Sequence, residues 1–303
     1  MRLFLALLLP SLFAAAATRP PGAAAEKAYF YIHTVTDMDK SIAFYRDVVG
    51  LKPKRVLSSF PTDRRTKSVE INRQANTPDA FFRPMYFELP GNDYGFELLE
   101  FTGIERTAIK PRLEDPGATF LILQVRNINS MLAKVKASGA TVVSASTAKI
   151  RSVWVRDLDG FYLLLEQPAH IPAKAPKGEI AGAAVGATVA DAARTVRFYQ
   201  DMFGFAPGKQ VTKQALADLT AIDTVKIPNS TFELQLWEFK GSDRKGIHPK
   251  MQDPGAPQFS LQFPEPAPAR TFLQAEGVEF LSPGVVYDPN GILVLVRGET
   301  PNH

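Results

Sequence analysis

The stretch VTDMDKSIAFYRDVVGL, at residues 35–51, carries the strongest structural signal in the chain. Its apolar residues Ile42, Tyr45 and Val49 recur at the three- to four-residue spacing of a helix that buries one side. A glycine follows directly, and glycine often ends a helix because it tolerates a left-handed backbone. The pattern therefore predicts a short strand followed by a helix over residues 38–49.

The same pattern occurs again in the second half of the chain. Residues 42–47 read IAFYRD and residues 196–201 read VRFYQD, and a glycine follows each segment at the same distance. Three further pairs of segments match in the same order: Phe101-Thr102-Gly103 with Phe239-Lys240-Gly241, Asp115-Pro116-Gly117-Ala118 with Asp253-Pro254-Gly255-Ala256, and Asp157-Leu158-Asp159-Gly160 with Asp288-Pro289-Asn290-Gly291. Four ordered matches are not expected by chance, so the chain is an internal duplication.

A proline-rich segment without apolar periodicity, residues 169–177, reads as the linker between the two copies. It separates one domain over residues 27–168 from a second over residues 178–300. Within each copy, a strand, a helix and further strands occur twice, so each copy holds two βαβββ units. We expect an α+β fold in which the two units of a domain form a curved mixed sheet and the two domains pair within the chain.

The N-terminal residues 1–25 are typical of a signal peptide with a short lead-in. Arg2 supplies a positive charge, residues 3–13 are largely apolar, and residues 14–17 are four alanines. The apolar run is too short for a permanent membrane anchor. The sequence predicts export to the periplasm or the cell exterior without stable membrane insertion after cleavage. The alternative is an N-terminal core helix.

Composition limits the classes of function. The chain has 303 residues, of which 45% are hydrophobic and 22% charged, as in ordinary globular proteins. It has no cysteine, which excludes thiol nucleophiles, and its four histidines fall in no metal-binding or triad motif. Lysines and arginines are scattered rather than clustered in a stripe with aromatic residues, so we expect no nucleic-acid partner.

The strand-helix stretch at residues 35–51 and the closing segments at residues 157–166 and 288–296 resemble the vicinal-oxygen-chelate superfamily. This superfamily includes glyoxalase I, extradiol dioxygenases and the bleomycin and fosfomycin resistance proteins. The resemblance covers nearly the whole chain after the N-terminal segment. It implies that two units form a cup, at the base of which catalytic members hold a divalent metal with His, Glu or Gln side chains.

The resemblance also implies which positions would hold that metal. They are Phe30, Glu97, Phe120 and Leu164 in the first half, and Ala184, Gln235, Gln258 and Leu295 in the second. One carboxylate and two amides are poor ligands for a divalent cation. We therefore expect no metal cofactor. The ligand-binding candidates are Phe30, Glu97, Phe120, Leu164, Gln235 and Gln258, and an apolar or aromatic small molecule would suit them. The alternative is that the aromatic residues fill the cups as core.

A shifted set of metal ligands remains open, built from Glu97, Glu166, Gln235 and His33. Strand alternation places His33 on the helix-facing side, where a structural role is the simpler interpretation. Three functions follow for this chain: binding of a small molecule without catalysis, a metal-dependent lyase, isomerase or dioxygenase, or a structural platform. Whether it is an enzyme is left open, and a glyoxalase-type lyase or a dioxygenase is the expected activity if it is.

Overall fold

The computed structural model describes residues 18–54, 60–145, 151–209, 211, 218–241 and 243–299. Most of the expected signal peptide, residues 1–17, lies outside the described residues. None of the helices in the described part of the chain is both long and apolar enough to cross a membrane.

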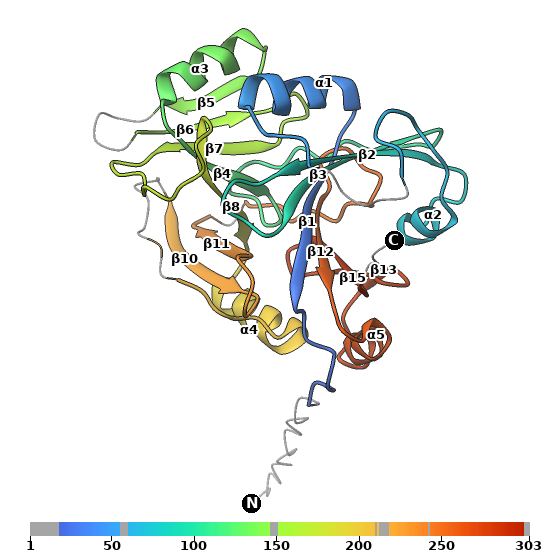
Figure 1. The fold of residues 1–303 in the computed structure, drawn as a ribbon. Coiled ribbons are helices and arrows are strands. Elements are labelled where there is room, and N and C mark those ends of the chain that lie inside the picture. Colours follow the sequence, from blue (N-terminus) through green and yellow to red (C-terminus); the bar gives the residue numbers. More distant parts are fainter. Residues whose placement is uncertain are drawn as a thin grey trace, which may run out of the picture.

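The strands form two mixed sheets (Figure 1). The seven-stranded sheet has the order β13-β14-β15-β12-β1-β3-β2. Its strands are β1 (Lys27–Thr34), β2 (Phe81–Glu88), β3 (Gly95–Thr102), β12 (Pro257–Gln262), β13 (Phe280–Ser282), β14 (Val285–Tyr287) and β15 (Leu293–Arg297). The eight-stranded sheet has the order β5-β6-β7-β4-β8-β11-β10-β9. Its strands are β4 (Thr119–Val125), β5 (Thr141–Ala145), β6 (Arg151–Arg156), β7 (Tyr162–Gln167), β8 (Ile180–Val189), β9 (Ala206–Pro207), β10 (Leu219–Lys226) and β11 (Glu233–Phe239). The expected α+β fold class is confirmed.

Each sheet combines strands from both halves of the sequence. In the seven-stranded sheet β1 pairs antiparallel with β12, and in the eight-stranded sheet β4 pairs antiparallel with β8. The first βαβββ unit therefore shares a sheet with the fourth, and the second shares a sheet with the third. We expected the two units of one half to share a sheet. Each sheet does hold two units, but the partners come from different halves.

Five helices and one π-helical segment accompany the described strands. They are α1 (Met38–Ala43), η1 (Phe44–Val49), α2 (Val69–Ala75), α3 (Ile128–Ala137), α4 (Ala192–Phe203) and α5 (Pro266–Ala275). The expected helix over residues 38–49 is present as α1 and η1, and it ends at Gly50, whose φ is 86°. Asp37 and Asp191 cap α1 and α4 at equivalent positions, each accepting a hydrogen bond from the backbone three residues on. In Figure 1, α1 and α3 lie at one end of the molecule and α4 and α5 at the other.

The largest core lies between these helices and one face of each sheet. It holds residues of both sheets, such as Tyr31 and Val185, together with Tyr45 and Tyr199 from the helices. The opposite face of each sheet carries its own smaller cluster of buried apolar side chains. We call this opposite face the cup face, and it contains the positions at which the superfamily resemblance places a site.

Candidate functional site

The cup face of the seven-stranded sheet brings together four of the expected site positions. Phe30 lies on β1, Glu97 on β3, Gln258 on β12 and Leu295 on β15. Ile32 is in register with both Glu97 and Gln258, so these side chains share one row on one face. Glu97 and Gln258, which the sequence places in different halves, therefore belong to the same cup.

Glu97 is the acidic residue of this row. It is partly exposed, and no residue in the described ranges forms a hydrogen bond or ion pair with its carboxyl group. Burial raises the pKa of Glu97 to about 7, and the positive charge of Arg297 acts against this shift. Glu97 can therefore be either a proton donor or an acceptor near neutral pH.

Gln258 is the second polar group of the row, and it is fully buried. Its amide Nε2 donates to Thr34 Oγ1 at 2.9 Å and to the Met251 carbonyl oxygen at 3.2 Å. Its Oε1 has no hydrogen-bond partner among the described residues. A buried acceptor without a partner is costly, so a hydrogen-bond donor placed next to this oxygen would be favoured.

Aromatic side chains occupy the space beside Glu97. Tyr86 is in register with Glu97 across β2 and β3, and its ring centroid lies 5.0 Å from that of Phe30. Phe30 lies over Gly95, where an added Cβ would come within 2.8 Å of Phe30 Cε1. Glycine at this position thus makes room for the Phe30 ring. A metal ligand is expected at this position from the resemblance, and the ring fills it instead.

The short helix α2 covers part of this cup face. Ile71 and Ala75 of α2 belong to the buried cluster of the cup. The carbonyl oxygen of Gln74 accepts from Ser282 Oγ, and Gln74 Oε1 accepts from Arg297 Nη2 at 3.2 Å. The cluster in full is Ile32, Ile71, Ala75, Ala80, Phe82, Leu99, Phe101, Met251, Val285, Tyr287, Leu293 and Leu295.

The cup face of the eight-stranded sheet differs in that aromatic residues fill its centre. The expected positions here are Ala184, Gln235, Phe120 and Leu164. The Phe120 ring centroid lies 5.0 Å from that of Trp154 and 5.0 Å from that of Trp237. Trp237 Nε1 donates to Gln235 Oε1 at 3.1 Å. The amide of Gln235 therefore has an internal partner, and the three rings are core.

The shifted set of metal ligands is not brought together. Glu97 lies on the seven-stranded sheet, whereas Gln235 and Glu166 lie on the eight-stranded sheet, on β11 and β7. His33 lies on the helix side of β1, fully buried. Within the described ranges, no group of three or more His, Cys, Asp or Glu side chains is placed to hold a metal ion.

His33 is instead part of a buried polar cluster. Its Nε2 lies 3.8 Å from Asp157 Oδ2, and its ring centroid lies 4.3 Å from that of Phe161. Burial lowers the pKa of His33, and the charges of Asp157 and Asp159 act against this shift. The Asp157 carboxylate also accepts from Tyr45 Oη at 2.8 Å. In the second half, Asp288 accepts from Tyr199 Oη at 3.2 Å, so each of these repeated aspartates anchors a helix.

Arg297 is a site residue that the sequence interpretation missed. It follows Leu295 by two residues on β15 and so shares its face. The sequence did contain a signal for it, because Arg297 continues the alternate positions Leu293 and Leu295 of the same strand. Its Nε has no hydrogen-bond partner among the described residues.

Residues 31–164 match the model of the Glyoxalase/Bleomycin resistance protein/Dioxygenase superfamily. The resemblance to the vicinal-oxygen-chelate superfamily is thereby confirmed. No curated protein matches the chain.

Solved structures share the fold over nearly the whole chain. Glyoxalase I from Zea mays aligns with a TM-score of 0.55 at 16% identity, covering 88% of this chain and 90% of its own. A mutant of the same maize enzyme aligns with a TM-score of 0.56 at 15% identity, covering 90% and 93%. A putative dioxygenase from Bacillus subtilis aligns with a TM-score of 0.56 at 12% identity, covering 92% and 86%. At these identities the likeness establishes the fold.

Proposed function

We propose that the protein binds a small apolar or aromatic molecule on the cup face of the seven-stranded sheet and does so without a superfamily-type metal. The observation that carries this proposal is Glu97, a carboxyl group without a hydrogen-bond partner among the described residues and set among aromatic side chains. A pocket with apolar walls and a few polar groups is the usual form of a small-molecule site.

The polar groups of the cup suggest the ligand's chemistry. Gln258 Oε1 accepts hydrogen bonds only, and Glu97 with a pKa of about 7 is ionised in part at neutral pH. A ligand that carries a hydrogen-bond donor on an aromatic ring would satisfy both groups and stack on Phe30 or Tyr86. We assign binding to this cup rather than the other, because Gln235 already has Trp237 as its partner.

A metal-dependent lyase, isomerase or dioxygenase is the second candidate. The observation in its favour is that Glu97 and Gln258 lie in one row of one cup. These two groups do not fit the superfamily's metal site, because one carboxylate and one amide leave a divalent cation short of protein ligands. A structural platform is the third candidate, and the ring-filled cup of the eight-stranded sheet favours it.

The place of action in this proposal is outside the cytoplasm, in the periplasm or beyond the cell. Arg2, the apolar residues 3–13 and the alanines at residues 14–17 support export. N-terminal sequencing of the protein purified from its natural host tests this, and a retained Met1 would contradict it.

The deciding experiment is elemental analysis of protein purified without chelators, for the unchanged chain, Glu97→Ala and Gln235→Ala. Gln235→Ala is the matched control in the other cup. We expect no stoichiometric zinc, manganese, nickel or iron in any of the three. Near-stoichiometric metal that is lost only in Glu97→Ala would overturn the non-catalytic proposal and lead to glyoxalase and dioxygenase assays.

Ligand binding is then tested with a thermal-shift panel of aromatic compounds that differ only in a ring hydroxyl or amine. We expect stabilisation by the donors, lost in Glu97→Ala and retained in Gln235→Ala. Stabilisation that is equal in all three proteins would place the ligand elsewhere and contradict the assignment to this cup.

A further inference from the structure

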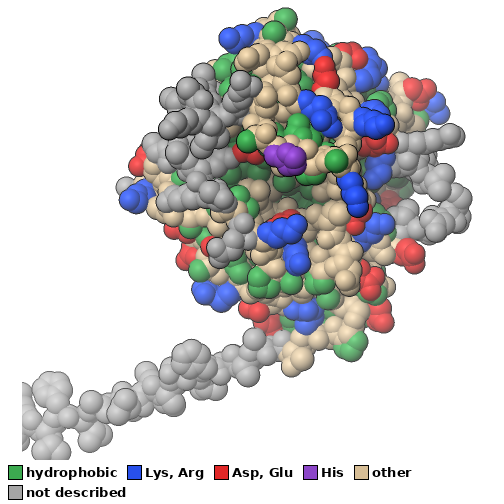
Figure 2. All heavy atoms as spheres, turned by 60° about the vertical axis from the view of Figure 1, so that its left-hand side comes forward, with side chains coloured by type: hydrophobic (Ala, Val, Ile, Leu, Met, Phe, Trp, Pro, Cys, Tyr) green, Lys and Arg blue, Asp and Glu red, His purple; other side chains and the backbone are tan. Residues whose placement is uncertain are grey.

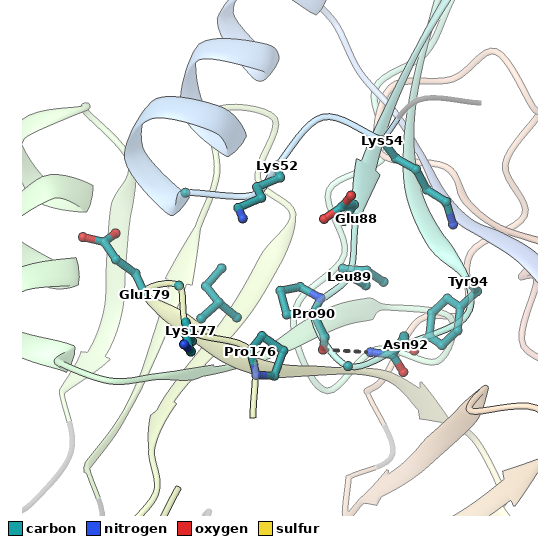
Figure 3. A pocket seen from close by; sticks show the side chains of 14 residues that line it. Lys52, Lys54, Glu88, Leu89, Pro90, Asn92, Tyr94, Pro176, Lys177 and Glu179 are labelled. Carbon is teal, nitrogen blue, oxygen red and sulfur yellow. Dashed lines mark hydrogen bonds between the residues drawn. The ribbon is translucent and has the colours of Figure 1, made fainter. Parts of the chain in front are cut away.

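A cavity lies beside the linker that joins the two sequence halves. It has a volume of about 390 Å³, within the range of small-molecule sites. Its walls come from the end of η1, the loop between β2 and β3, and the linker leading into β8. The lining includes Lys52, Lys54 and Lys177, together with the apolar side chains of Leu89, Pro90 and Pro176 (Figure 3).

The walls of this cavity are fixed by hydrogen bonds. Arg126 holds the linker by donating to the carbonyl oxygens of Pro176 at 2.6 Å and Gly178 at 2.9 Å. Asn92 Nδ2 holds the opposite loop by donating to the Ala183 carbonyl oxygen at 2.8 Å. These hydrogen bonds hold both walls in place, so binding there would cost little ordering of the chain.

The charges that face the cavity are unbalanced. Lys52, Lys54 and Lys177 line it, together with the carboxylates of Glu88 and Glu179. Glu179 is already paired, because Lys134 Nζ lies 2.6 and 2.8 Å from its two oxygens. Three lysines thus oppose one unpaired carboxylate.

The side chains of Lys52 and Lys177 form no hydrogen bond or ion pair with any described residue. Lys54 lies over the Phe30 ring at 5.7 Å, and the charges of Glu88 and Asp93 act on it as well. In Figure 3 the ammonium groups of Lys52 and Lys54 lie on either side of Glu88, across from Pro90 and Pro176. In Figure 2, Lys and Arg side chains lie scattered over one face of the molecule, with Asp and Glu side chains among them.

We propose that this cavity binds a small organic dianion with an apolar body. Two negative charges would neutralise the excess of lysine, and a planar or aliphatic body would lie on Leu89, Pro90 and Pro176. The cavity has a different lining from the cup of the proposed function, although Lys54 also lies over Phe30 of that cup. It depends on Lys52 and Lys54 of the first half and on Lys177 at the end of the linker, so the ligand would bridge the first half and the linker.

The test is titration calorimetry of the full chain with phthalate, a dicarboxylate on an aromatic ring, at constant ionic strength. The variants are Lys52→Ala, Lys177→Ala and the double variant. Lys136→Ala is the control, because it removes an equal charge from an exposed position on α3 outside the cavity. We expect each single variant to weaken binding by about threefold, the double variant by about tenfold, and the control by less than about twofold.

A second measurement locates the ligand. In amide NMR spectra of the labelled full chain, phthalate should shift Gly50, Gly91 and Gly178, which line the cavity. Benzoate, with one charge, should bind at least about tenfold more weakly than phthalate. No binding of phthalate at millimolar concentration, equal binding to the double variant, or equal binding of benzoate would each overturn the proposal.

Discussion

Glu97 combines partial burial with a titration near neutrality. Burial raises the pKa of Glu97 from 4.5 to about 7. The folded chain therefore holds this proton more tightly than the unfolded chain does. The stability that it contributes is complete below pH 4.5 and is lost as the pH rises through 7. Ionisation of Glu97 therefore lowers the stability of the folded protein.

We expect Glu97→Gln to match the unchanged protein near pH 4 and to exceed its stability at pH 8. The gain should be about 1–3 kcal/mol, because the amide removes the cost of a buried charge. Urea denaturation at both pH values measures it. Glu88→Gln, at an exposed position, serves as the control. A gain that is the same at both pH values would mean that ionisation is not its cause.

His33 titrates in the opposite sense. Burial lowers its pKa below 6.5, although Asp157 and Asp159 act against the shift. Below pH 6.5 the unfolded chain therefore takes up a proton that the folded chain does not, and stability is lost as the pH falls. We expect His33→Gln to flatten the fall in unfolding free energy between about pH 7 and pH 5. An unchanged slope would contradict this.

Single-residue predictions from the sequence depended on strand alternation, which is local. It placed His33 on the helix side of β1, and the structure has it there, beside Asp157 and Phe161. It could not bring Gln258 beside Glu97, because alternation gives the face of a residue but not the neighbouring strand. The hydrogen bond from Arg297 to Gln74 could not be predicted for the same reason, because alternation does not say which elements are neighbours.

At the scale of elements, glycines on the central strands make space for aromatic rings. Gly186 on β8 is in register with Phe120 on β4, and a Cβ added at Gly186 would overlap the Phe120 ring. We expect Gly186→Ala to destabilise the protein by about 1–3 kcal/mol, measured by urea denaturation. Gly178→Ala, where an added Cβ meets nothing, should change stability by less than about 0.5 kcal/mol.

A double-mutant cycle checks that the overlap is with this ring. Phe120→Leu should relieve much of the cost of Gly186→Ala, so the two effects should not add. Strict additivity would assign the cost to the backbone of β8 instead of to the contact with Phe120.

The elements that the sequence predicted well are those with local signals. The helix over residues 38–49 has a capping aspartate and a terminal glycine, and it formed as expected. The covering helix α2 went unnoticed because seven residues offer no full amphipathic repeat. What holds α2 in place is remote in sequence, through Ser282 and Arg297.

At the scale of the molecule, the shared sheets bind the two halves into one unit. If the chain is divided within the linker at residues 169–177, each half exposes the edges of two strands that it should pair, β1 and β4 or β8 and β12. We expect each half expressed alone to be insoluble or unfolded, and the two expressed together to form a folded one-to-one complex. Light scattering and circular dichroism measure this. A stable, soluble, monomeric single half would contradict it.

The pairing of β1 with β12 also imposes a delay during synthesis, because the two partner strands are made far apart in time. β1 leaves the ribosome early, whereas its partner begins at Pro257, near the end of the chain. At roughly 5–20 residues per second, the edge of β1 waits on the order of ten seconds or more for its neighbour. During that interval a nascent chain and the next one on the same message offer each other matching edges. A chaperone that covers the unpaired edge of β1 would therefore raise the yield of the correctly paired monomer relative to a domain-swapped dimer.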